Sequence, residues 1–181
     1  MPIQSSDIQY KYSVTTGTTG NTTVGTAAGS NGRFISTTQL TDAVLNNLFP
    51  DVTGDENAAQ NLDYKCIFVH NAHPTLVLQR TVIWLATEVA GGADTAIALD
   101  NIGVVPVGQG PGAQAAQIAN KNTAPTGTTA FGSPTTKATG LAIGDIAPGS
   151  VIAIWVRRTA KNTPAQNNDG VTLRVEGDTA A

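Results

Sequence analysis

The stretch Ile146-Ala-Pro-Gly-Ser150, followed directly by Val151-Ile-Ala-Ile-Trp-Val-Arg-Arg158, decides the fold class. Pro148 presets its own φ and Gly149 accepts a positive φ, so this pair is typical of a tight turn. The run behind the turn is apolar and rich in β-branched and aromatic residues, which favours a strand. The chain is therefore expected to consist of strands joined by Pro/Gly turns.

Segments on both sides of this stretch alternate in the same way. The further candidate strands are 8–12, 64–70, 76–85, 94–101 and 171–176, with a weaker one at 102–107. The segment 64–70 is apolar on both faces, which predicts a core strand, and we expect it to form a hairpin with 76–85. Six or seven short strands predict an all-β fold, an antiparallel β-sandwich of jelly-roll or immunoglobulin-like type, and the sequence leaves both topologies open.

One short helix is predicted within 36–49. Apolar residues recur there at helical spacing, at Leu40, Val44, Leu45 and Leu48. Ser36 and its threonine neighbours offer N-caps, and Pro50 ends the pattern.

Two flexible parts are expected around a single β-sandwich domain at 34–181. Residues 1–33 form an extended Thr/Gly-rich N-terminal arm, because 13–32 hold too little apolar surface to offset the entropy of ordering. Such an arm is ordered when a partner holds it, or else it is a free tail. A long flexible loop is expected near 108–140, and we expect early proteolytic cuts within 13–33 and 108–140.

The composition predicts a neutral surface. Charged residues make up only 13% of the chain and aromatic residues 5%, and the formal net charge is −3. Uncharged polar surfaces pack on other proteins with little desolvation of charge. The basic residues are scattered, which argues against nucleic-acid binding, and no apolar run is long enough to cross a membrane. Because the N-terminus shows no signal-peptide pattern and Cys66 is the single cysteine, we expect synthesis in the cytoplasm and no intrachain disulfide.

Two groups of side chains have metal-binding chemistry, and neither has a suitable spacing. Cys66 and His70 share a strand face but lie about 13 Å apart along it, too far for one metal ion, and His73 falls in the turn that follows. The acidic residues Asp51, Asp55 and Glu56 do not match a calcium-binding loop, so a solvated loop or a helix cap is expected. No metal site is predicted.

No catalytic signature stands out either. The chain has no Gly-x-Ser-x-Gly elbow. Gly108-Gln-Gly-Pro-Gly112 lacks the Gly-Lys-Ser/Thr ending of a phosphate-binding loop, and Pro111 removes a backbone donor. We therefore expect a protein that is not an enzyme and that has no cofactor and no small-molecule substrate.

Five residues are candidates for an interface with other proteins. Arg157 and Arg158 end a core strand and point to opposite faces, and an arginine can pair with a carboxylate through two hydrogen bonds. The alternative is an ordinary solvated strand end. Thr15, Thr18 and Thr22 lie in the expected arm, whose main chain could add a strand to the sheet of a neighbour.

Three stretches carry a resemblance to a known group. They are 47–56 (NLFPDVTGDE), 63–71 (DYKCIFVHN) and 146–150 with 154–158 (IAPGS and IWVRR). In this order they resemble small virion structural proteins of tailed bacteriophages, over roughly residues 45–175. The resemblance implies a capsid decoration or cement protein on the virion surface, which binds the major capsid protein and itself as a homo-oligomer such as a trimer.

Two alternatives remain open at this point. The same sandwich could belong to a tail, baseplate or fibre component that binds a host receptor or glycan through its long loop. Phe131 is the single aromatic residue in 108–140, which argues against glycan stacking. A carbohydrate-binding module of bacterial origin is the other alternative.

Overall fold

The computed structural model describes residues 2–108, 114–166 and 168–179. These residues form nine strands: β1 (Ile8–Val14), β2 (Phe34–Gln39), β3 (Leu62–Asn71), β4 (Leu78–Glu88), β5 (Asp94–Leu99), β6 (Val105–Pro106), β7 (Leu141–Ile146), β8 (Ser150–Thr159) and β9 (Val171–Thr179). They also contain the helix α1 (Gly54–Ala58) and two 3₁₀ turns, η1 (Ser5–Asp7) and η2 (Lys137–Thr139).

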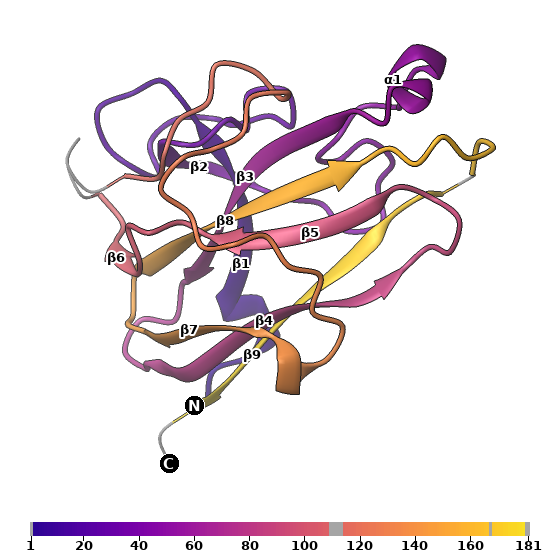
Figure 1. Cartoon of the computed structure of the whole chain (residues 1–181). Helices are drawn as coiled ribbons and strands as arrows, with labels where there is room; N and C mark the ends of the chain where they lie inside the picture. Colours follow the sequence, from indigo (N-terminus) through magenta and orange to yellow (C-terminus); the bar gives the residue numbers. More distant parts are fainter. Residues whose placement is uncertain (1, 109–113, 167, 180–181) are drawn as a thin grey trace.

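The strands form two sheets in which every pairing is antiparallel (Figure 1). The larger sheet has the order β2-β1-β3-β8-β5, with β6 also paired to β8. The smaller sheet has the order β7-β4-β9. The expected all-β sandwich is thereby confirmed.

Strands β3 and β8 are central and have both faces covered. Between the two sheets lies an inner core, made of side chains such as Ile67, Val69, Ile152, Ile154, Ile83 and Leu85. On the opposite face of the larger sheet lies an outer core, made of side chains such as Cys66, Phe68, Ala153, Trp155, Ala115 and Ile118. Successive residues of a strand alternate between these two cores, which explains why 64–70 is apolar on both faces.

The turn at 146–150 has the expected geometry. Gly149 has φ 68°, and the amide of Ser150 donates to the carbonyl of Ala147 at 3.0 Å. The turn carries the chain from β7 in the smaller sheet to β8 in the larger one. The expected strand behind the turn is confirmed as β8.

The expected hairpin between 64–70 and 76–85 is wrong, although both strands exist. β3 pairs with β1 and β8, whereas β4 pairs with β7 and β9 in the other sheet. The segment between them is a corner held by side chains. Asn71 Nδ2 donates to the carbonyls of Leu76 and Ile146, each at 2.9 Å, and His73 Nδ1 accepts from the amides of Thr75 and Leu76.

The expected helix within 36–49 is also wrong. Residues 34–39 form β2, and 40–50 form a loop that we call the 40–50 loop. Ala43 and Asn46 have φ of 56° and 57°, which no right-handed helix contains. The short helix is α1, four residues after the loop, where the Thr53 side chain and Glu56 form a capping box.

The expected N-terminal arm folds back onto its own sheet. The amide of Asn21 donates to Ile35 O at 2.7 Å and the amide of Thr37 to Thr23 O at 2.9 Å, so this segment covers the edge of β2. The buried Ser30 hydroxyl accepts from the amide of Ser13 and donates to Cys66 O. Hydroxyl and main-chain hydrogen bonds replace the apolar burial that the segment lacks.

The segment 114–140 packs along both sheets: Ala115 and Ile118 join the outer core, 128–132 bridge to the edge of β5, and Pro134 O accepts from the amide of Leu85 in β4 at 2.8 Å. Gly32 and Gln117 form a bridge, as do Ile97 and Gly132. Gly32 has φ 93°, and a Cβ there would lie 1.8 Å from Ala116 O, so only glycine permits this approach. The loop expected near 108–140 is thus packed against the two sheets from residue 114 onward, and its part at 109–113 lies outside the described residues.

Candidate docking surface

The 40–50 loop is anchored at both ends. Its first amide, that of Leu40, donates to Tyr10 O at 2.8 Å. Near its other end the Tyr12 hydroxyl donates to Asn47 O, and the Leu48 side chain is only 8% exposed in the inner core. The Asn47 Nδ2 donates across the loop to Thr41 O at 2.9 Å. These contacts fix the position of the residues between them.

The tip of this loop presents two adjacent aliphatic side chains to solvent. Val44 is 51% exposed and Leu45 is 70% exposed. They lie between Ala43 and Asn46, the two residues of this loop that have positive φ. For an alanine this conformation costs about 1 kcal/mol, and such strain persists where the surrounding structure enforces it. Sequence reasoning placed both side chains on a helix face, and the Asn46-Asn47 pair was the available signal for a turn.

A recess of about 450 Å³ lies beside the loop. Its walls include Asn46, Leu48, Pro50, Asn31 and Lys65. Lys65 is only 3% exposed, and its Nζ donates to Ala28 O at 2.8 Å and to Asn31 Oδ1 at 3.3 Å. Burial lowers the pKa of this amine below its ordinary value. The recess therefore combines apolar walls with a buried amine.

Arg158 is half-buried and engaged by its own chain. Its guanidinium pairs with Asp63, donates to Pro50 O at 2.6 Å and lies 4.8 Å from the centre of the Phe49 ring. Asp63 is 4% exposed and also binds Lys121 at 3.2 Å. This network ties the end of the 40–50 loop to β3 and β8, so Arg158 supports the loop from within.

Arg157 points to the opposite face of the sheet, as the alternation of the strand requires. Its guanidinium lies 5.2 Å from the centre of the Phe131 ring, and its Nε is buried with no hydrogen-bond partner. The Phe131 ring in turn packs edge-on against Tyr64, with 5.6 Å between the ring centres. Phe131 is thus engaged on its own sheet and is not a free stacking surface.

The three threonines lie in the segment that covers β2. Thr18 and Thr22 are exposed, and the Thr22 hydroxyl donates to Thr19 O at 2.9 Å. Thr15 is half-buried, and its carbonyl accepts from Arg33 at 2.7 Å. The structure places them on a different part of the chain surface from Arg158, whose contacts are with β3 and the 40–50 loop.

The residues with metal-binding chemistry have structural roles. Within the described residues, no three His, Cys, Asp or Glu side chains come together in a way that could hold a metal ion. Cys66 is fully buried, which raises the pKa of its thiol well above the ordinary value. Burial, with the charge of Lys11 nearby, lowers the pKa of His70 to about 4. His73 Nδ1 accepts hydrogen bonds from the amides of Thr75 and Leu76 in the corner between β3 and β4.

The acidic segment contains the helix cap that was one of its two expected roles. Glu56 caps α1 together with Thr53 and forms an ion pair with Lys121. The hydrogen bond from Lys121 lowers the pKa of Glu56 to about 2, with help from the backbone of Thr53. Asp51 and Asp55 are exposed.

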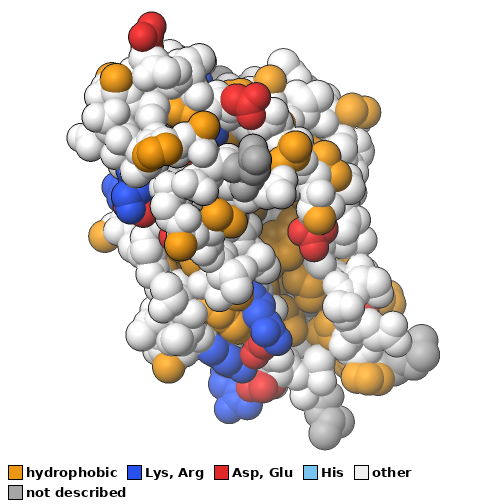
Figure 2. All heavy atoms as spheres, turned by 90° about the vertical axis from the view of Figure 1, so that its right-hand side faces the viewer, with side chains coloured by type: hydrophobic (Ala, Val, Ile, Leu, Met, Phe, Trp, Pro, Cys, Tyr) orange, Lys and Arg blue, Asp and Glu red, His pale blue; other side chains and the backbone are white. Residues whose placement is uncertain are grey.

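The chain as a whole carries few charges, since charged residues make up 13% of it. Figure 2 shows one face of the molecule, on which apolar side chains are scattered and also form the floor of a hollow, with a group of Lys/Arg and Asp/Glu side chains below it. Among the described residues, no helix has the length and apolar character that a membrane crossing requires. A surface with few charges suits contact with another protein.

Comparison of the chain with protein-family models, with curated proteins and with solved structures finds no match.

Proposed function

We propose that this chain is a virion structural protein of a tailed bacteriophage, a capsid decoration protein that stabilises the shell by binding the major capsid protein and itself. The observation that carries the proposal is the anchored 40–50 loop, which exposes Val44 and Leu45. The sequence resemblance over 45–175 and the small share of charged residues support it.

Docking would proceed through fixed loops. Burial of one large aliphatic side chain contributes about 1.5–3 kcal/mol, and a loop that is already ordered loses little entropy on binding. The segment 15–33 packs on its own sheet, so a wrapping arm is not required. Many weak contacts repeated over a shell add up through avidity.

The experiment is an electron-microscopy map of the intact particle combined with virion assembly from variants. We expect hundreds of copies on the shell, and we expect Leu45→Asp to leave the folded protein off the particle. Val89→Asp is the matched control, because Val89 is also exposed (37%) but lies outside the loop. A few copies located at the tail, baseplate or fibres would favour the receptor-binding alternative and contradict the proposal.

A further inference from the structure

Strand β9 is an edge of the smaller sheet, and the hydroxyl of Tyr10 contacts the middle of this edge. The strand pairs with β4 on one side and with no other strand of the described residues. Its inward side chains, Val171, Leu173 and Val175, pack on the inner core but are only half-buried. An edge strand with unpaired main-chain groups is a template for a strand from another chain.

β9 lacks two common protections of an edge. The register of the β4–β9 pair shifts twice, between Gln79 and Val82 and between Leu85 and Thr87, and both extra residues belong to β4. β9 is therefore regular along its whole length, and it contains no proline. Natural edges are often blocked by a bulge or a proline, and β9 has neither.

The open side of β9 carries the main-chain groups of its odd-numbered residues. The Leu173 carbonyl accepts from the hydroxyl of Tyr10, a residue of β1 in the other sheet, at 3.4 Å. Burial raises the pKa of Tyr10 to about 12, and a hydrogen bond from the Val175 backbone opposes this. The main-chain N–H and C=O groups of Leu173 and Val175 therefore point away from β4. Because alternate residues of a strand share this direction, residues 171, 177 and 179 do the same.

We propose that the partner is a second copy of this chain, with the two β9 strands antiparallel about a two-fold axis through Val175. Val175 is the midpoint of β9, so all nine residues find a partner in this register. On the outer face, Arg174 then lies opposite Glu176 of the partner subunit, and the same pair recurs on the other side of the axis. The three-stranded sheets join into one sheet.

Charge selects this register over its neighbours. Moving the axis by one residue would place Arg174 opposite its own copy, or Glu176 opposite its own copy. Cross-strand pairs of opposite charge contribute about 0.2–1 kcal/mol each, whereas like charges destabilise. The pairing costs the hydrogen bonds of the Tyr10 hydroxyl with Leu173 O, which is long at 3.4 Å, and with the Val175 backbone. Arg174 and Glu176 already form an ion pair within the chain at 2.9 Å, and Lys137 pairs with Glu176 at 3.2 Å, so these exposed side chains must also rearrange. The pairing does not depend on a capsid and is a property of the purified chain.

The first test is sedimentation of the full chain across about 1–100 µM. We expect a species of twice 18.5 kDa. Arg174→Glu should weaken the dimer at least about tenfold, since like charges then face each other twice. The double variant Arg174→Glu/Glu176→Arg should restore it. Lys161→Glu, which makes the same change in net charge outside β9, should leave it unchanged.

The second test fixes the register. Residues 172 and 178 of the partner subunit form a pair without main-chain hydrogen bonds, whose Cα atoms come within about 4.5 Å, close enough for a disulfide. Thr172→Cys/Asp178→Cys should form a covalent dimer under oxidation, and Thr172→Cys alone should not. Tyr10→Phe should tighten the dimer, because the hydroxyl no longer occupies the edge. A monomer at every concentration, or a dimer indifferent to these changes, overturns the proposal.

Discussion

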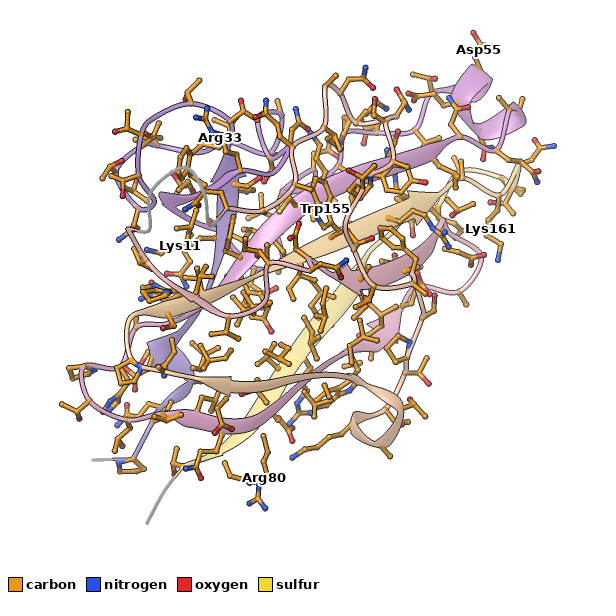
Figure 3. The ribbon with its side chains drawn as sticks, turned by 60° about the vertical axis from the view of Figure 1, so that its left-hand side comes forward. Lys11, Arg33, Asp55, Arg80, Trp155 and Lys161 are labelled. Atoms are coloured by element: carbon orange, nitrogen blue, oxygen red, sulfur yellow. The ribbon has the colours of Figure 1, made fainter. Side chains whose placement is uncertain are left out.

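The indole Nε1 of Trp155 donates to Oδ2 of Asp100 at 3.0 Å, across the outer core. The same carboxylate accepts from the amide of Ala116 at 2.9 Å and from the amide of Ile102 at 3.0 Å. Trp155 is fully buried and Asp100 is 5% exposed. One buried carboxylate thus joins the central strand β8 to the layer that covers it, and Figure 3 shows Trp155 in the middle of the larger sheet.

Replacing Asp100 with alanine should lower the free energy of unfolding by about 3–5 kcal/mol. The change removes three hydrogen bonds to a charged acceptor and leaves the Trp155 indole and two amides without partners. Urea denaturation measures the loss, and hydrogen exchange at the Ala116 amide should accelerate. Asp145→Ala is the control, because Asp145 is exposed and accepts from a single amide, that of Arg80. Equal losses in the two variants would contradict the role assigned to Asp100.

Replacing Arg158 with methionine should destabilise the fold by about 3 kcal/mol. The variant keeps the aliphatic stem but leaves Asp63, which is 4% exposed, with Lys121 as its remaining cation. Arg80→Gln provides the comparison, since Arg80 forms an ion pair with Asp178 at the exposed surface and points away from the body (Figure 3). That change should stay within about 0.5 kcal/mol. Thermal or urea unfolding of both variants measures the difference.

His70 should make the stability fall between about pH 6.5 and pH 4. Its pKa is about 4 in the folded chain, against about 6.5 for an unfolded histidine, so protons bind the unfolded state first as the pH falls. The contribution of His70 to the free energy of unfolding is complete above the unfolded pKa. It declines by at most about 3 kcal/mol as the pH falls to the folded pKa.

The check is the difference in unfolding free energy between the wild type and His70→Leu, measured from pH 7.5 to 3.5. The variant should lack the decline, and at neutral pH it should be at least as stable, because the buried Nδ1 of His70 has no hydrogen-bond partner. Glu56 titrates in a lower range, since its folded pKa is about 2, and it contributes equally to both curves. Parallel curves for the two proteins would show that His70 is solvated in the fold.

Periodicity predicted seven of the nine strands and the central place of β3, but it missed β2 and β7 and did not predict which strands pair. The corner at Asn71 and His73 sends β4 to the other sheet, and it works through side-chain hydrogen bonds that no hydrophobic pattern records. The 40–50 loop has the apolar spacing of a helix for another reason: Leu48 is buried and Leu40 partly buried by tertiary packing, whereas Val44 and Leu45 are exposed at the tip. The capping box at Thr53 and Glu56 depends on local spacing alone, and a helix cap was one of the two roles expected for this segment.

Less of the candidate site could be predicted from the sequence. Arg157 and Arg158 were correctly expected on opposite faces, because alternation is a local rule. Their partners come from distant segments: Phe131 for Arg157, and Asp63 with Phe49 for Arg158. No periodicity links such positions.

Limited proteolysis should spare the segment once expected to be a free arm. Trypsin needs an extended and accessible backbone. At the Arg33–Phe34 peptide bond, the N–H and C=O of Arg33 form hydrogen bonds with residues 115–116, and the Phe34 side chain is fully buried. The Lys121 carbonyl is likewise bonded, by the amide of Tyr64 at 2.6 Å. We therefore expect the first cut after Lys161, in the exposed connection that follows β8, with the bonds after Arg33 and Lys121 intact. Mass spectrometry of the early fragments identifies the order. Cleavage after Arg33 at the rate seen after Lys161 would mean that residues 15–33 leave the sheet in solution, and a wrapping arm would again be the better account of how this chain holds its neighbours.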